Sequence, residues 1–206
     1  MFGQMQLFQL ELKQAGWPAL FAPTLSMLPF GIFLAMYLSV NEGLHEIAFS
    51  MLDGLLIILP VAGAALWSYL FTGNTFERSR HSFLAADTHY AFKAFLRAGV
   101  SLSFICTLAA GISMLCAPEY VREIVFLTLR TTAMMLACMA VISLCSYVLH
   151  GAYIGIVAST VFAVLSFSGL APRGGETSLN YSYLMFFIAA AVAVTLLICE
   201  KYLKRG

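Results

Sequence analysis

Six apolar stretches, separated by short polar segments, run through this chain of 206 residues. They cover about 17–40, 49–71, 97–116, 124–149, 151–171 and 183–199. A helix that crosses a bilayer needs about 20 mostly apolar residues, and each stretch is close to that length. The pattern therefore predicts an all-α integral membrane protein, with six transmembrane helices in a single domain over 1–206.

Two further segments have the pattern of helices that do not cross the bilayer. In residues 1–16, polar side chains recur at Gln6, Gln9 and Lys13 opposite an apolar line, as in a helix lying flat in the membrane interface. The longest polar stretch, 72–97, predicts a short amphipathic helix at about 75–86. Asp87 or Thr88 then caps a new helix that continues into the third span.

The composition supports this interpretation. Hydrophobic residues make up 61% of the chain and charged residues 10%, whereas soluble domains have roughly 45–50% and about 25%. A soluble fold of this size could not bury so much apolar surface. The net charge of +1 also excludes a strongly basic nucleic-acid-binding protein.

The distribution of Lys and Arg predicts the orientation, because cytoplasmic loops carry an excess of these residues. With six spans and a cytoplasmic N-terminus, the outer side holds only Arg122 and Arg173. The cytoplasmic side holds Lys13, Arg78, Arg80, Lys93, Arg97, Lys201, Lys204 and Arg205. We therefore expect a multi-pass protein of the cell inner (plasma) membrane with both termini in the cytoplasm.

Two charged residues fall inside the predicted spans. Arg130 lies six residues after Ile124, about 9 Å from the outer edge by helical rise, and Asp53 has a similar depth from the same side. They are predicted to form an intramembrane ion pair or a gate. The alternative is that both side chains reach up to the outer surface.

Backbone-shaping residues give two further candidates. Pro60 in the second span removes a helical hydrogen bond and is either a hinge or a fixed kink. Gly151, Gly155 and Ser159 are four residues apart on the fifth span, a spacing that lets helices approach closely. They predict either an interface between two subunits or packing within the chain.

The sequence offers no pattern for catalysis or metal binding. The four histidines are not paired with other ligands at helical spacing, so we expect no metal. Asp53 is the only Asp in a span, which argues against a paired-aspartate protease, and no GxxxxGK[ST] phosphate loop is present. The chain is therefore expected to lack enzymatic activity and cofactors of its own.

The segment after the second span carries a family resemblance. Phe76-Glu77-Arg78, Phe83-Leu84 and Lys93 resemble the acidic residue, coupling helix and following basic residue in permease subunits of ABC-2-type transporters, the small six-span exporters similar to type V. The chain departs from that pattern at Ser79–Ser82, where the family has Gly-Thr, and at Ala85–Asp87, where it has a proline. These departures leave the subfamily and substrate open.

The resemblance implies two protein partners. A separate cytoplasmic ABC ATPase would bind ATP and Mg²⁺ and dock on the coupling helix, through Phe76, Glu77, Arg78, Arg80, Phe83 and Leu84. A second permease copy, identical or related, would complete the translocation path, with residues 172–182 as the outer gate. The alternative for the coupling helix is that it lies on lipid headgroups.

The expected function is thus that of an exporter permease for an amphipathic cargo such as a peptide, lipid or drug. Two alternatives remain at this stage. One is a substrate-binding membrane subunit of a vitamin uptake system, which would bind its ligand tightly on its own. The other is a non-transport membrane protein, such as an immunity or assembly factor.

Overall fold

The computed structural model describes residues 6, 9, 13, 16, 18–39, 58–68, 89–149, 152–170 and 175–203, and these contain helices and turns but no strand. The helices are α2 (Pro18–Ser39), an unlabelled helix over Ile58–Ser68, α5 (Tyr90–Cys116), the 3₁₀ turn η2 (Pro118–Tyr120), α6 (Val121–Leu149), α7 (Ala152–Leu170) and α8 (Gly175–Leu203). The all-α prediction is confirmed for this part of the chain.

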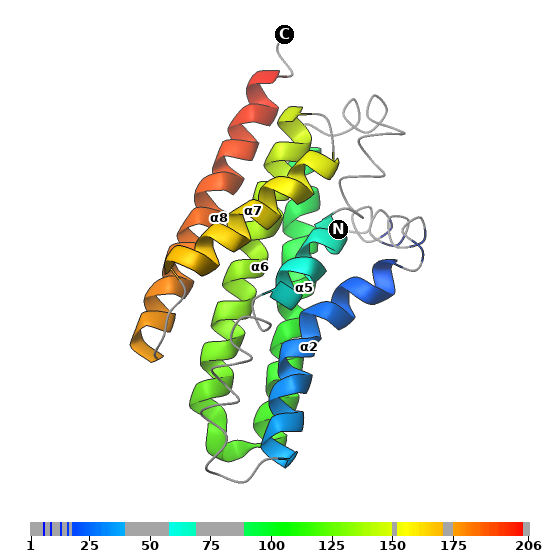
Figure 1. The fold of residues 1–206 in the computed structure, drawn as a ribbon. Coiled ribbons are helices and arrows are strands. Elements are labelled where there is room, and N and C mark those ends of the chain that lie inside the picture. The colour runs from blue at the N-terminus through cyan, green and yellow to red at the C-terminus, as the bar shows by residue number, and fades with distance from the viewer. Residues whose placement is uncertain are drawn as a thin grey trace.

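The four helices from α5 to α8 run alternately up and down in one bundle (Figure 1). The turn η2 joins α5 to α6 at the lower end, whereas the start of α5 and the end of α8 lie at the upper end. α2 packs along α5 in the same direction: the Ser26 carbonyl contacts Cys106, and the rings of Phe33 and Tyr120 meet edge-on near η2.

Four of the described helices are long and apolar enough to cross a membrane, as in a multi-pass membrane protein. They comprise Ala19–Met36, Tyr90–Cys116, Pro118–Leu149 and Asn180–Tyr202. Within the second and fifth predicted spans, the structure describes shorter apolar helices, Ile58–Ser68 and Tyr153–Leu165. The number of six spans therefore stays a prediction.

α6 is the central helix of the bundle, in contact with α5, α7 and α8. Its side chains are buried around much of its circumference, including Ala133, Ala137 and Ala140, which are small enough for neighbouring backbones to approach closely. Van der Waals packing of this kind holds helices together where lipid is as apolar as the side chains. Because α6 is central, its own Arg130 is buried in the bundle.

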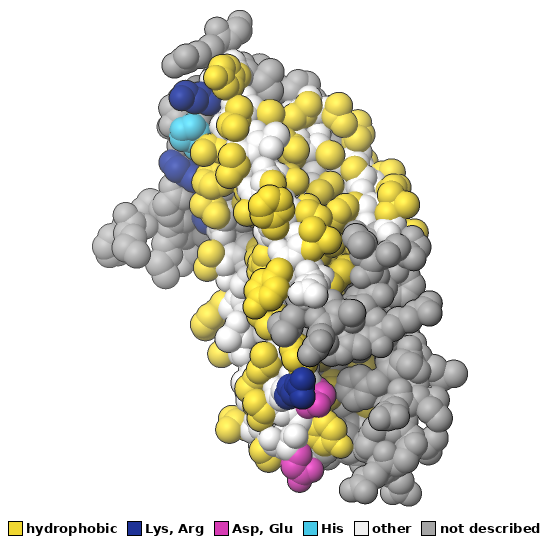
Figure 2. All heavy atoms as spheres, turned by 90° about the vertical axis from the view of Figure 1, so that its left-hand side faces the viewer, with side chains coloured by type: hydrophobic (Ala, Val, Ile, Leu, Met, Phe, Trp, Pro, Cys, Tyr) yellow, Lys and Arg dark blue, Asp and Glu magenta, His cyan; other side chains and the backbone are white. Residues whose placement is uncertain are grey.

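The outer surface is apolar between two charged ends. On α5 the exposed side chains form one line at helical spacing: Leu96, Val100, Phe104, Leu108, Ile112 and Leu115. No charged residue occurs over 98–116, about 28 Å of helix, which matches the roughly 30 Å hydrocarbon core of a bilayer. Figure 2 shows hydrophobic side chains over most of the described surface between these ends.

One loop prediction is wrong. Residues 172–182 were expected to form a loop and an outer gate, but α8 begins at Gly175 and includes the rest of that segment. Thr177, Ser178 and Asn180 are poor helix formers by themselves. Tertiary packing outweighs that preference, since Tyr181 and Ser182 are buried and the Tyr181 hydroxyl donates to Met134 Sδ of α6.

The predicted interfacial helix over 1–16 is described at only four positions. Gln6, Gln9 and Lys13 are helical and exposed, and Gly16 follows with φ of 63°. That left-handed conformation favours glycine and turns the chain before α2, where the Ala19 amide donates to the Gly16 carbonyl. The interfacial helix itself stays a prediction.

Candidate functional site

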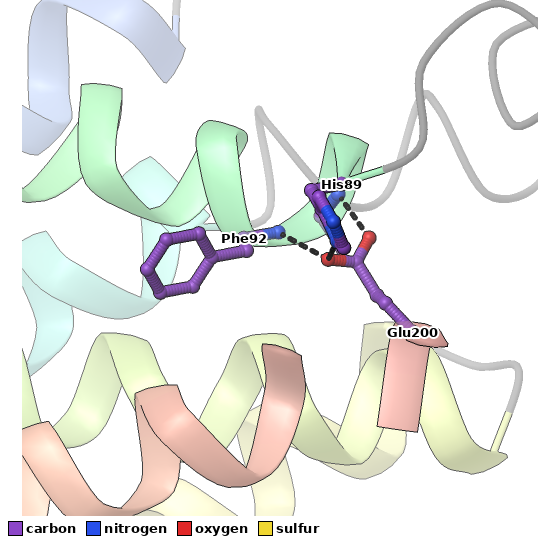
Figure 3. A network of polar contacts seen from close by, with 4 residues as sticks. His89, Phe92 and Glu200 are labelled. Atoms are coloured by element: carbon purple, nitrogen blue, oxygen red, sulfur yellow. Dashed lines mark hydrogen bonds and ion pairs between the residues drawn. The ribbon is translucent and has the colours of Figure 1, made fainter. Parts of the chain in front are cut away.

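The most deeply buried charged group among the described residues is Glu200, near the end of α8. Its side chain is fully inaccessible to solvent. The Ala91 amide donates to Oε1 at 2.7 Å, and the Phe92 amide donates to Oε2 at 3.2 Å. Figure 3 shows the carboxylate turned toward the first turn of α5, from a helix 109 residues further along the chain. We call Glu200 and these two amides the clasp.

The start of α5 explains why a carboxylate is held there. The first amides of a helix have no partner within that helix and carry the positive end of its dipole. The N-cap residue of α5 is His89, whose side chain makes no capping hydrogen bond. The predicted cap at Asp87 or Thr88 is therefore wrong in position, and Glu200 supplies the missing acceptor from outside the helix.

Several basic side chains belong to the same end of the bundle as the clasp. His89 Nδ1 lies 4.0 Å from Glu200 Oε2, and the Arg97 guanidinium lies over the Tyr90 ring at 5.7 Å from its centroid. Lys93 and the exposed Lys201 belong to the same end of α5 and α8. Because charge-assisted hydrogen bonds are about twice as strong as neutral ones, the clasp ties the start of α5 firmly to the end of α8.

A second polar region lies on the seam between α6 and α8. Arg130 is only 9% exposed and lies nine residues from the start of α6, about 13 Å by helical rise. Its charge is close enough to the buried Tyr181 to interact electrostatically with the phenol. The neighbouring Thr131 hydroxyl is also buried and has no hydrogen-bond partner among the described residues. The sequence correctly picks out Arg130 as a charge inside the bundle.

The proposed partner of Arg130, Asp53, lies outside the described residues, so their ion pair stays a prediction. The same is true of all six predicted coupling residues: Phe76, Glu77, Arg78, Arg80, Phe83 and Leu84. Pro60 is buried in the helix Ile58–Ser68, but the preceding turn is not described and the hinge is untested.

The small-residue face of the fifth span packs within the chain. A Cβ added to Gly155 would lie 2.6 Å from Ser146 Oγ and 2.7 Å from the Ile142 carbonyl, both on α6. Ser159 is fully buried as well, and Gly151 lies outside the described residues. This face was predicted to form either a subunit interface or a contact within the chain. At Gly155 it is occupied by α6, which is the contact within the chain.

Glu200 was missed because it stands beside Lys201, Lys204 and Arg205, in what looks like a solvated tail. The signal that would have found it is periodicity. Besides Ser182, the buried residues of α8 recur at steps of three and four: Tyr181, Met185, Ala189, Ala193, Leu196 and Glu200. A carboxylate in phase with a buried stripe indicates a buried acceptor that needs donors.

The described residues contain no group of three or more His, Cys, Asp or Glu side chains that could hold a metal ion. The polar groups described above are a buried hydrogen-bond acceptor, Glu200, a buried cation, Arg130, and basic side chains at one end of the bundle. No protein-family model, curated protein or solved structure matches this chain. The function is therefore inferred from the sequence and from these contacts.

Proposed function

We propose that this chain is the permease subunit of an ATP-driven exporter of the ABC-2 type. It would cross the cell inner (plasma) membrane six times, with both termini in the cytoplasm. A separate ABC ATPase would supply the energy, and a second permease copy would complete the path. The cargo class that fits the mostly apolar spans is an amphipathic peptide, lipid or drug.

The observation that carries the proposal is the clasp. The segment that resembles the family, about 76–93, continues into the first turn of α5, and Glu200 ties that turn to α8. α8 in turn packs along α6, the central helix. Movement of an ATPase docked on the segment before α5 would thus be passed to α5 and α8 together, rather than absorbed at a loose helix end.

The first experiment tests the ATPase partner. The tagged full-length chain is purified from its native membranes in mild detergent, and co-purifying proteins are searched for an ATPase with a GxxxxGK[ST] loop. We expect Phe76→Ala, Glu77→Ala and Phe83→Ala together to abolish that association. Glu119→Ala and Arg122→Ala, exposed at the opposite end, are the matched control and are expected to keep it.

The second experiment tests coupling. Glu200→Ala is expected to leave the ATPase bound but to remove stimulation of its activity by cargo in proteoliposomes, because only the link from α5 to α8 is cut. Absence of any ATPase, or an association that survives the triple substitution, contradicts the proposal. Tight binding of a small vitamin by the chain alone would instead favour the uptake-subunit alternative.

A further inference from the structure

The helix Ile58–Ser68, drawn in cyan in Figure 1, contacts two neighbouring helices in different ways. At Gly63 it approaches α2 so closely that an added Cβ would overlap the Ser26 hydroxyl. Near its end, the Trp67 indole Nε1 donates a hydrogen bond to Ser101 Oγ of α5 at 3.0 Å. The helix is therefore packed against α2 by its backbone and joined to α5 by a polar side-chain contact. We call the hydrogen bond from Trp67 to Ser101 the tether.

The tether is a directed contact between buried groups. Trp67 is only 3% exposed, and a buried indole N–H needs an acceptor. The Ser101 hydroxyl uses its own proton to donate to the Ala98 carbonyl at 2.9 Å, which leaves its lone pairs to accept from Trp67. The tether therefore determines which side of α5 faces the end of the helix Ile58–Ser68.

The tether and the clasp hold α5 at different levels and on different sides. Ser101 lies nine residues after Phe92, which is about 14 Å and about 2.5 turns of helix, so the two residues lie on opposite sides of α5. α5 is one continuous helix without proline. Two contacts separated in this way determine both the rotation and the tilt of a stiff helix, whereas one contact leaves a free rotation.

The geometry of the clasp depends on where the first turn of α5 lies. α5 and α8 contact each other much less than each contacts α6, so packing between them does little to fix that turn. The hydrogen bond from the Phe92 amide to Glu200 is 3.2 Å long, at the upper end of the usual range for N–H···O bonds. A displacement of the first turn by a few tenths of an ångström would therefore lengthen it beyond that range.

From this arrangement we infer that Trp67 is a positioning residue for the clasp. Through Ser101 it holds α5 in the rotation and tilt that place the Ala91 and Phe92 amides on Glu200. Loss of the tether then loosens the clasp, although Ser101 lies about 14 Å further along α5. One consequence rests on the proposed function: the second span and α8 change position together during transport, because each is attached to α5.

Hydrogen exchange at the Ala91 and Phe92 amides, measured on the full-length chain in detergent micelles, tests the role of Trp67. Trp67→Phe keeps an aromatic ring but removes the donor, and Ser101→Ala removes the acceptor. Each should accelerate exchange at the two amides about threefold, the average effect of a hydrogen bond between membrane helices. Because both substitutions remove the same contact, the double variant should exchange no faster than either single variant.

Two further variants separate the tether from general destabilisation. Ser101→Thr keeps the hydroxyl and should keep the exchange rates of the unchanged protein. Thr107→Val is the matched control, since it removes a hydroxyl that donates to the Ser103 carbonyl of the same helix. It should leave exchange at the clasp amides unchanged. Unchanged exchange in both variants that break the tether, or an equal acceleration in Thr107→Val, would overturn the inference.

The consequence for transport is tested separately, in proteoliposomes that contain the associated ATPase. Trp67→Phe should keep the ATPase bound but reduce the stimulation of its activity by cargo, and Ser101→Thr should retain that stimulation. Full stimulation in Trp67→Phe would contradict the joint movement of the second span and α8. The exchange measurement needs no ATPase. A chain without one would therefore contradict the proposed function, while the exchange rates alone would decide the role of Trp67.

Discussion

The two buried charged residues in the described part of the chain are stabilised in different ways. Glu200 is fully buried at the end of α8 and accepts two backbone hydrogen bonds from α5. Arg130 is almost as deeply buried in α6, but lies among the side chains of the seam with α8, next to Tyr181. The Glu200 charge is balanced by a helix terminus, whereas the Arg130 charge interacts electrostatically with the Tyr181 side chain.

This difference has a functional consequence. Backbone amides of a helix terminus are fixed in place, so the Glu200 carboxylate holds two helices in one relative position. Side chains around Arg130 have rotamers to exchange, and they lie well inside the bundle. Under the proposed function, the Glu200 end would therefore transmit a movement between α5 and α8, whereas the Arg130 region would be rearranged by one.

The largest effect is expected at Glu200. Glu200→Ala should lower the free energy of unfolding by about 4 kcal/mol, because two hydrogen bonds to a charged acceptor are lost. Denaturant unfolding in detergent measures this change, and hydrogen exchange should show lost protection at Ala91 and Phe92. Glu123→Ala removes an exposed carboxylate from the first turn of α6 and should cost under about 1 kcal/mol. Equal effects of the two substitutions would contradict the clasp.

The next effect concerns Arg130 and its predicted partner. Arg130→Asp alone should cost about 3 kcal/mol, because it replaces one buried charge by its opposite. If Asp53 is the partner, adding Asp53→Arg should recover most of that loss in the same unfolding assay. A double variant no more stable than Arg130→Asp would show that the balancing groups are elsewhere on the seam.

Substitutions that change packing but no charge test whether the Glu200 carboxylate or general packing holds the start of α5. Gly155→Ala should cost about 2 kcal/mol, since the new Cβ would overlap α6 at Ser146 and Ile142. Gly111→Ala, whose Cβ would meet nothing within 4 Å, should be neutral or stabilising by up to about 1 kcal/mol. Amide protection at Ala91 should survive in both variants. Its loss in Gly155→Ala would mean that general packing, not the carboxylate, holds α5.

The smallest effect is expected at His89. Its Nδ1 is 4.0 Å from Glu200 and the side chain is 39% exposed, so its attraction to the carboxylate is weakened by solvent. His89→Ala should change the free energy of unfolding by about 0.5 kcal/mol or less. A loss as large as that of Glu200→Ala would make the ion pair, rather than the amides, the basis of the clasp.

Much of the helical fold could be predicted because apolar spans are encoded locally. The predicted span 124–149 corresponds to α6, and 151–171 to α7, within a few residues at each end. The boundaries failed where tertiary contacts outweigh local preference. α8 starts at Gly175 rather than 183, because Tyr181 and Ser182 are buried in the bundle.

The candidate site, too, could be predicted from the sequence only where local features determine it. A buried cation in an apolar run, Arg130, is visible in the sequence because its cost depends on residue type and depth alone. The capping of α5 by Glu200 is not, because the donor amides and the acceptor are separated by 109 residues. The small-residue spacing at Gly155 shows that a close contact exists, but not which helix makes it.

Composition and periodicity by themselves determined that this chain forms apolar helices with all charges except Asp53 and Arg130 near the predicted span ends, since burial of apolar surface and backbone hydrogen bonding act over a single helix. Which helix ends meet was decided only by the tertiary structure. Packing of α5, α7 and α8 around α6 brought an acidic residue from an apparently solvated tail onto the bare amides of α5. That pairing depends on the relative position of two helices, which no local pattern specifies.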